Sequence, residues 1–121
     1  MDVKEMFNQI EDYHKTLGYH YKNMSAQECL DNIRHTGLAL YQEVGELIDS
    51  FPWKPWRKIE DQPSDEYNAA IEIVDILFFL GAIRAAAHIS SETIEALFDY
   101  KLRENYDRIK RGYNNDPDER G

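Results

Sequence analysis

The sequence contains one cysteine, Cys29, among its 121 residues. A single cysteine cannot form a disulfide bond within the chain, and this usage fits a reducing compartment. Prolines and glycines are few, four and six respectively, and no segment alternates apolar and polar residues as a half-buried β-strand does. These absences favour one helical domain, which a chain of this length can build around one modest core.

Basic residues are scarce, with 14 lysines and arginines against 23 aspartates and glutamates and a formal net charge of −9. This balance argues against a nucleic-acid partner, because phosphate backbones are bound by basic surfaces. It leaves room for a small phosphorylated ligand held through a metal ion. The longest apolar run, residues 76–83, is too short to span a bilayer, and the chain starts with an acidic, amphipathic segment. We therefore expect a cytoplasmic protein (in the host cytoplasm if the source is viral) with no membrane partner.

Helical spacing of apolar residues and helix-capping signals divide the chain into four segments. Ser25 and Glu28 form the pattern of a capping box, Ser64 is the expected cap of the third helix, and Ser90 or Ser91 that of the fourth. The prediction is an all-α, four-to-five-helix bundle in a single domain, residues 1–113, followed by a polar tail, residues 114–121, expected to be disordered. The expected helices cover residues 3–17, 25–50, 64–88 and 90–112.

Two pairs of acids stand out within these helices. Glu43 and Glu46 lie in the second helix, and Glu72 and Asp75 lie in the third. Residues three apart share one face of a helix, so each pair directs both carboxylates the same way. The second pair lies in an almost wholly apolar segment, residues 69–80, where unpaired charge is costly. A hard divalent cation, held by oxygen ligands from two facing helices, would offset that cost.

Simpler interpretations of the acids remain open. Glu43 and Glu46 alone fit a solvated helix face. Glu72 and Asp75 fit a structural buried ion pair with a cation from elsewhere in the chain; the candidates are Arg34, Arg84 and Lys101. The third helix is also apolar on more faces than a small monomer can cover, so we expect a homodimer or homotetramer.

Three segments resemble one known family. They are residues 46–57, which include Phe51-Pro-Trp-Lys-Pro-Trp56, residues 72–79, and Asn105-Tyr-Asp-Arg108 with Gly112-Tyr113. Together with the two acid pairs they resemble the all-α nucleoside triphosphate pyrophosphohydrolases, a superfamily that includes the MazG-type enzymes and the dimeric dUTPases. The resemblance covers residues 32–113.

The resemblance implies an enzyme that hydrolyses a deoxynucleoside triphosphate to the monophosphate and diphosphate. Two or three Mg²⁺ ions, which Mn²⁺ can replace, would bind Glu43, Glu46, Glu72 and Asp75, with Glu43 and Glu46 also catalytic and Glu43 a candidate general base. The tryptophan-rich loop makes dUTP the first expected substrate. The short chain, like that of MazG-type enzymes, keeps dGTP and dCTP as alternatives. A non-catalytic helical interaction module is the alternative of another class.

The resemblance and the residue types also suggest substrate contacts. Basic residues of the loop and of the fourth helix would bind the phosphates, and a tryptophan would stack on the base unless it packs in the core or an interface. Two asparagines near the acid pairs would hydrogen-bond the sugar or base. The candidates are Lys54, Arg57, Lys101, Asn105, Arg108 and Tyr113 for phosphate, Trp53 and Trp56 for stacking, and Asn32 and Asn68 for the nucleoside.

Overall fold

The computed structural model describes residues 1–112 and is helical, with no strand in that range. The all-α prediction is therefore confirmed. Tyr113 and the expected tail, residues 114–121, lie outside the described residues. The helices are α1 (Val3–Thr16), α2 (Ala26–Asp49), α3 (Glu66–Ala86) and α4 (Ser91–Lys110), with two short 3-10 helices, η1 (Tyr21–Asn23) and η2 (Ile59–Asp61).

The helix starts follow local hydrogen-bonding rules. The capping box of α2 is present: the Glu28 amide donates to Ser25 Oγ at 3.1 Å, and the Ser25 amide donates to Glu28 Oε1 at 3.0 Å. Ser90 caps α4 by accepting from the Thr93 amide at 3.1 Å. Each cap satisfies an amide that the first helical turn leaves without a partner.

The prediction for α3 was wrong at its start. Asp65, not Ser64, caps it and accepts from the Asn68 amide at 2.9 Å, because the Asp65 amide is itself tied to the Ser50 carbonyl at 2.9 Å. This tie fixes Asp65 in an extended conformation one residue before the first turn. The helix ends at Ala86, close to the expected end near His88, and His88 has a φ of 59° in the left-handed region, which stops a helix.

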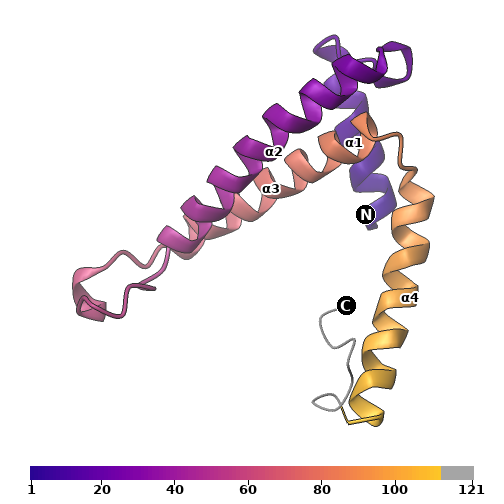
Figure 1. The fold of residues 1–121 in the computed structure, drawn as a ribbon. Helices are drawn as coiled ribbons and strands as arrows, with labels where there is room; N and C mark the ends of the chain where they lie inside the picture. The colour runs from indigo at the N-terminus through magenta and orange to yellow at the C-terminus, as the bar shows by residue number, and fades with distance from the viewer. Residues whose placement is uncertain (113–121) are drawn as a thin grey trace.

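The helices form two arms that meet at a bend (Figure 1). This bend, the elbow, is where α1 contacts both the end of α3 and the start of α4. One arm is the antiparallel hairpin of α2 and α3, closed at its tip by the loop that contains η2. The other arm is α4, which starts beside α1 at the elbow and runs away from the hairpin. A buried cluster at the elbow includes Tyr21, Cys29 and Ala86. The acid pairs lie along the hairpin, toward its tip.

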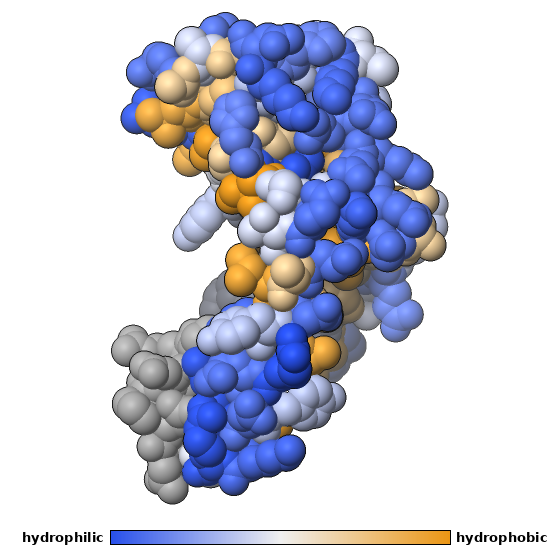
Figure 2. Space-filling view, turned by 90° about the vertical axis from the view of Figure 1, so that its right-hand side faces the viewer, coloured by the Kyte–Doolittle hydropathy of each residue, from blue (hydrophilic) through white to orange (hydrophobic). Residues whose placement is uncertain are grey.

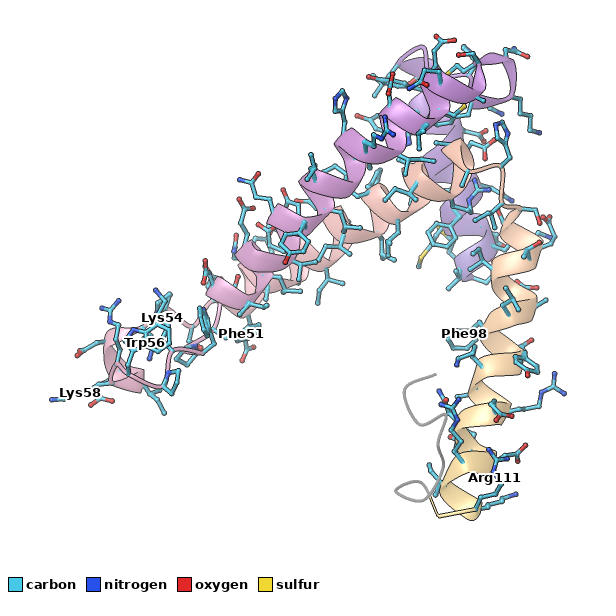
Figure 3. All side chains as sticks on the ribbon, in the orientation of Figure 1. Phe51, Lys54, Trp56, Lys58, Phe98 and Arg111 are labelled. Atoms are coloured by element: carbon cyan, nitrogen blue, oxygen red, sulfur yellow. The ribbon has the colours of Figure 1, made fainter. Side chains whose placement is uncertain are left out.

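Apolar side chains remain exposed along both arms. On α3, Ile73 is 51% exposed and Leu80 is 41% exposed, and on α4, Phe98 is 63% exposed. Hydrophobic side chains interrupt the hydrophilic surface at several places in Figure 2. Phe98 points from α4 toward the space between the arms (Figure 3). None of the described helices is long and apolar enough to cross a membrane.

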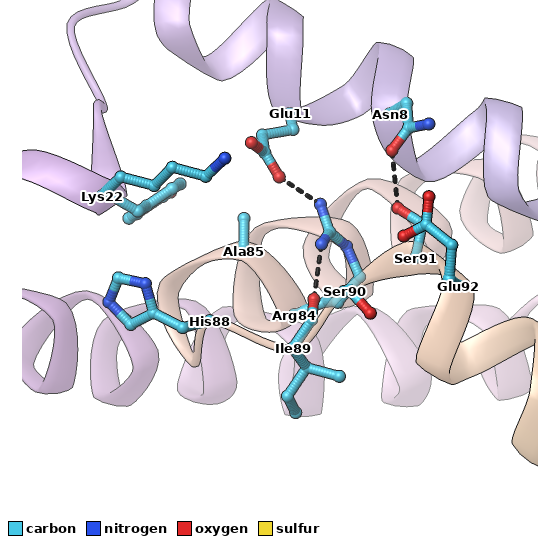
Figure 4. Close-up of a pocket in the computed structure, with 11 residues that line it drawn as sticks. Asn8, Glu11, Lys22, Arg84, Ala85, His88, Ile89, Ser90, Ser91 and Glu92 are labelled. Carbon is cyan, nitrogen blue, oxygen red and sulfur yellow. Dashed lines mark hydrogen bonds and ion pairs between the residues drawn. The ribbon is translucent and has the colours of Figure 1, made fainter.

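Arg84 fixes the elbow (Figure 4). Its guanidinium is buried, donates to the Glu11 carboxylate of α1, and donates to the Ile89 carbonyl, in the turn before α4, at 2.6 Å. Burial of Glu11 opposes its ionisation, but the hydrogen bond and charge of Arg84 outweigh that effect and lower the pKa of Glu11. A second tie joins Ser91 Oγ to Asn8 Oδ1 at 2.6 Å. Charged hydrogen bonds in a buried setting are strong, so the direction in which α4 leaves the elbow is well defined.

Gly81 allows α1 and α3 to approach closely. A Cβ atom there would lie 2.7 Å from Ile10 Cγ2, and Ile10 is itself buried. We expect Gly81→Ala to lower the free energy of unfolding by about 1 kcal/mol or more, because an overpacked core must shift to relieve the contact. Urea unfolding of the purified protein measures this change.

Gly37→Ala is the matched control, because a Cβ at this α2 position meets nothing within 4 Å. There the gain in helix propensity should raise stability by about 0.5–1 kcal/mol. Equal effects of the two substitutions would contradict the close approach of α1 and α3.

Candidate metal centre and nucleotide site

The hairpin brings acids from both pairs together. Single carboxylate oxygens of Glu43, Glu46 and Glu72 lie within 4.8 Å of one another, a spacing that one cation could bridge. Asp75, one turn beyond Glu72 on α3, is close enough for its charge to act on Glu43 and Glu46. Three of the four predicted ligands thus form one cluster, and the fourth lies beside it.

Two carboxylate oxygens in this cluster are buried without a hydrogen-bond partner, Glu43 Oε2 and Glu72 Oε2. Buried polar atoms are almost always satisfied in folded proteins, so a cation bound at this position would satisfy both oxygens. All members of the cluster offer hard oxygen donors, which suit Mg²⁺ and Mn²⁺ rather than softer metals. The residues present therefore fit the expected metal.

The carboxyls also affect one another's protonation. A hydrogen bond with the Glu72 carboxyl, together with desolvation and the charges of Glu72 and Asp75, raises the pKa of Glu43. The charge of Glu43 is the largest cause that raises the pKa of Glu46. Like charges held this close disfavour full ionisation unless a cation neutralises them.

The alternative of a structural ion pair finds no support in the described residues. Arg84 pairs with Glu11 of α1, and Arg34 pairs with Asp31 at 3.5 Å on its own helix. Lys101 lies on the other arm, on α4. Glu72, which is buried, and Asp75, which is half-buried, are thus left without a basic partner from the three candidates.

An apolar groove of about 940 Å³ opens beside the acids, between α1 and α3. Glu43 and Asp75 line the groove together with mostly apolar side chains, both aliphatic and aromatic, among them Tyr13 and Phe78. These two rings meet edge to face, with their centroids 5.9 Å apart. Inspection of the sequence missed this groove, because the apolar spacing of α1 also fits ordinary packing. The only available signal was the aromatic content of α1 and of residues 78–79.

The loop at the hairpin tip is built around Gln62. Its Oε1 accepts from the Lys54 amide at 2.9 Å, and its Nε2 donates to the carbonyls of Lys54 at 2.8 Å and Arg57 at 3.1 Å. Trp53 donates from its indole to Asp49 Oδ1 at 2.7 Å and meets Trp56 edge to face. Lys54 and Trp56 lie at the tip of the hairpin (Figure 3). The predicted loop residues therefore share one ordered loop, and the residue that holds it had not been identified from the sequence.

The role of Gln62 in holding the loop in place can be tested by substitution. We expect Gln62→Ala to raise the KM for a nucleoside triphosphate about fivefold with little change in kcat, since losing hydrogen bonds worth roughly 1 kcal/mol loosens the loop before binding. Steady-state kinetics separates the two constants. Glu60→Ala, an exposed residue of the same loop, is the control and should leave both constants unchanged. Equal KM values for the two variants would show that loop order does not matter for binding.

The two asparagines are engaged in other contacts. Asn68 Nδ2 donates to Ser50 Oγ at 2.9 Å and so links the start of α3 to the end of α2. Asn32 Oδ1 accepts from the Tyr21 hydroxyl at 3.2 Å, near the elbow. Asn32 precedes Glu43 by about 16 Å along α2, from the rise of a helix. The structure therefore places Asn68 near the hairpin tip and Asn32 well away from the acids.

The α4 candidates lie on the other arm. Lys101 is half-buried, Asn105 is exposed, and Arg108 is 5% exposed, with its Nε 3.9 Å from Glu104 Oε1. The spacing of these three residues puts them on one face of α4. The structure does not bring them to the acid cluster of the same chain (Figure 1).

Two antiparallel helices that carry facing acids form the arrangement that the resemblance to the all-α nucleotide pyrophosphohydrolases implied. A sequence model of the dUTPase family matches residues 2–108, so the chain belongs to that family. No curated protein and no solved structure matches the chain. The predicted resemblance is confirmed, and the match extends it to α1, the helix that forms one wall of the groove. The protein is thus a nucleotide hydrolase of the pyrophosphohydrolase type.

Proposed function

We propose that the protein is a Mg²⁺-dependent nucleoside triphosphate pyrophosphohydrolase that converts dUTP to dUMP and diphosphate. The observation that carries the proposal is the cluster of Glu43, Glu46 and Glu72 with two buried, unpartnered carboxylate oxygens. Membership in the dUTPase family supports the choice of dUTP. Glu43, Glu46, Glu72 and Asp75 would hold the ions.

Each part of the site has a task in this reaction. Bound divalent cations would neutralise the triphosphate charge and make water a better nucleophile toward the α-phosphorus. Glu43 would accept a proton from the attacking water at its carboxylate, since its pKa is raised above the ordinary value by the neighbouring carboxyls and by desolvation. Lys54 and Arg57, in the ordered loop, would bind the phosphates that leave as diphosphate. These roles separate water activation from leaving-group binding.

The groove between α1 and α3 is the position proposed for the base. Its aromatic side chains suit a flat ring, and because two of the proposed metal ligands, Glu43 and Asp75, line the groove, a nucleotide bound there would have its phosphates close to the metal. Gln9 of α1 also lines the groove, and its amide can both donate and accept a hydrogen bond. A site that hydrogen-bonds a base edge discriminates strongly against bases that leave its polar groups unpaired.

A substrate panel tests the proposal directly. Diphosphate release is measured with dUTP, dTTP, dCTP and dGTP, each with Mg²⁺, with Mn²⁺ and with EDTA. We expect dUTP to give the highest kcat/KM, Mn²⁺ to support the reaction, and EDTA to abolish it. Preference for dCTP or dGTP would support the proposed reaction but contradict dUTP as its substrate. Full activity in EDTA would contradict the metal-dependent mechanism.

The raised pKa values of Glu43 and Glu46 predict that the stabilisation by Mg²⁺ depends on pH. A carboxyl whose folded pKa lies above its unfolded value contributes stability below the unfolded pKa and loses it as pH rises through the folded pKa. At neutral pH the metal-free cluster is therefore strained by repulsion, which Mg²⁺ relieves. We expect Mg²⁺ at tenfold its Kd to raise the Tm by about 5 °C at about pH 7.5 and by clearly less at about pH 5, where protons compete. Thermal unfolding measures both values, and an equal gain at the two pH values would argue against binding at these carboxylates.

A further inference from the structure

We propose that Ser50 and Asn68 fix the register of α2 against α3 and thereby position the acids of the proposed metal centre. Each of the two residues lies one helical turn from an acid of the cluster, so both are positioning residues and neither is a metal ligand. The inference rests on the proposed function, because that function assigns a metal ion to the acids. Metal affinity and helix geometry test it without any measurement of hydrolysis.

A short chain of hydrogen bonds joins the end of α2 to the start of α3. Asn68 Nδ2 donates to Ser50 Oγ at 2.9 Å, and the Asp65 amide donates to the Ser50 carbonyl at 2.9 Å. Ser50 Oγ in turn donates to the Glu46 carbonyl at 3.3 Å. Ser50 is 4% exposed and Asn68 is half-buried, so little water competes for these bonds. The Ser50 hydroxyl, which both accepts and donates, is the point at which the two helices are tied together.

The Ser50–Asn68 bridge lies on the helix faces that carry the acids. Ser50 follows Glu46 by four residues, and Asn68 precedes Glu72 by four residues. Residues four apart share a helix face, and they are separated by about 6 Å along the helix axis. One side-chain contact therefore links the backbone at Glu46 to the turn that precedes Glu72. A shift of either helix along its axis would strain this contact and change the distance between the two carboxylates.

The acids have no basic side chain to hold them in place. Within residues 1–112, no lysine or arginine forms an ion pair with Glu43, Glu46 or Glu72. The carboxylates interact with one another instead. In metal sites, hydrogen bonds from neighbouring groups usually orient the ligands. Here the backbones of α2 and α3 take that role, so the register of the two helices determines how the carboxylates meet an ion.

Apolar packing and the loop constrain the register little near the acids. Beside the cluster, Ile73 and Val74 of α3 are 51% and 50% exposed, whereas the buried alanines of this helix, apart from Ala69, lie toward the elbow. The loop, residues 51–64, is held by Gln62, whose side chain bonds to other loop residues. A connection of this length allows more than one position of its two ends. The Ser50–Asn68 bridge supplies the missing constraint.

The first experiment measures metal affinity in the absence of nucleotide. Mn²⁺ binding to the purified protein is followed by the electron paramagnetic resonance signal of the free ion. We expect Asn68→Ala and Ser50→Ala each to raise the Kd about tenfold, since losing groups that orient metal ligands costs about 10–100-fold in affinity. Asn68→Ala should fold, because alanine favours a helix and the amide of residue 68 keeps its bond to Asp65. The double variant should bind no more weakly than either single variant, because both substitutions remove the same contact.

Gly81→Ala is the control for a loss of stability alone. It strains the contact between α1 and α3, so it should lower the free energy of unfolding and leave the Kd for Mn²⁺ unchanged. An unchanged Kd in Asn68→Ala, or an equal rise in Gly81→Ala, would make the Ser50–Asn68 bridge an ordinary stabilising contact and overturn the proposal. Additive losses of affinity in the double variant would contradict a shared contact.

The second experiment measures the register directly. Spin labels are attached to Leu38→Cys of α2 and Tyr67→Cys of α3, at positions that are 73% and 78% exposed, in a chain that also carries Cys29→Ala. Double electron–electron resonance gives the distribution of distances between the labels without metal. Asn68→Ala should broaden this distribution, and saturating Mg²⁺ should narrow it again, because ligands from both helices would bind one ion. A distribution that Asn68→Ala leaves unchanged would contradict the role of the bridge.

Together the measurements separate failure of this inference from failure of the proposed function. A wild type that binds no Mn²⁺ and releases no diphosphate would reject the proposed function, while broadening in Asn68→Ala would still uphold the register that the bridge sets. Hydrolysis with equally tight Mn²⁺ binding in the wild type and in Asn68→Ala would uphold the function and overturn the positioning role.

Discussion

Glu72→Gln should reduce diphosphate release on the order of a hundredfold or more while the protein stays folded. Substitutions even at groups that only support metal ligands cost about 10–100-fold, and Glu72 is proposed as a direct ligand. Its side chain is almost fully buried, and its Oε2 has no hydrogen-bond partner. Glutamine keeps the shape but supplies a weaker, neutral donor. Removing one charge from the cluster also relieves repulsion on Glu43, so the unfolding temperature without metal should hold or rise.

Glu66→Gln is the control for this substitution. Glu66 lies in the first turn of the same helix and is exposed, so losing its charge should leave the rate near that of the wild type. The gain in Tm on adding Mg²⁺ should disappear in Glu72→Gln and persist in Glu66→Gln. Near-normal hydrolysis by Glu72→Gln would make Glu72 a structural acid and contradict the proposed centre.

The helices were largely predictable because their signals are local. A capping box such as Ser25 with Glu28 involves residues three positions apart, and the apolar spacing that defines α2 and α3 repeats within each helix. The error at the start of α3 arose from a distant contact, the bond between the Asp65 amide and the Ser50 carbonyl. Serine and aspartate both cap helices well, so residue type alone could not choose between Ser64 and Asp65.

The acid cluster was predictable for a different reason. Charge inside an apolar helix is expensive, and that cost is visible in the sequence around Glu72 and Asp75. The opposing acids on α2 then follow from pairing two helices in a hairpin. Contacts between elements cannot be recognised in this way. The groove beside Tyr13 and the Arg84–Glu11 pair depend on how segments far apart in the chain are placed. The loop held by Gln62 depends on the path of an irregular segment.

The placement of α4 also lay beyond the sequence. Helical spacing correctly placed Lys101 and Arg108 on one face, but it cannot say which acids that face meets. Arg108 is 5% exposed, with its Nε 3.9 Å from Glu104 Oε1, so its substitution would perturb α4 as well as any phosphate contact. Lys54 is the cleaner probe of phosphate binding, because it lies in the ordered loop at the hairpin tip.

Lys54→Ala should lower kcat/KM for the triphosphate about tenfold or more, which corresponds to roughly 1.4 kcal/mol. A chain of net charge −9 repels a free triphosphate, so binding depends on the few local cations besides the metal. Charge-assisted hydrogen bonds to phosphate are among the stronger contacts that a side chain makes. Gln62 holds the backbone of Lys54 through both its amide and its carbonyl, so the ammonium group would reach bound phosphates from an ordered backbone. Lys54→Arg should retain more activity than Lys54→Ala, because the positive charge remains.

Comparing how Lys54→Ala affects binding of the triphosphate substrate and of the monophosphate product shows whether Lys54 binds the leaving phosphates. The monophosphate lacks the β and γ groups, so Lys54→Ala should weaken its binding much less than that of the triphosphate. Inhibition by the monophosphate and the KM for the triphosphate provide the two measurements. Lys22→Ala is the control: Lys22 is exposed at the elbow, away from the hairpin tip, and its loss removes the same charge from the chain. Equal weakening of both nucleotides by Lys54→Ala, or an equal effect of Lys22→Ala, would show a general effect of charge instead of a contact with the β and γ phosphates.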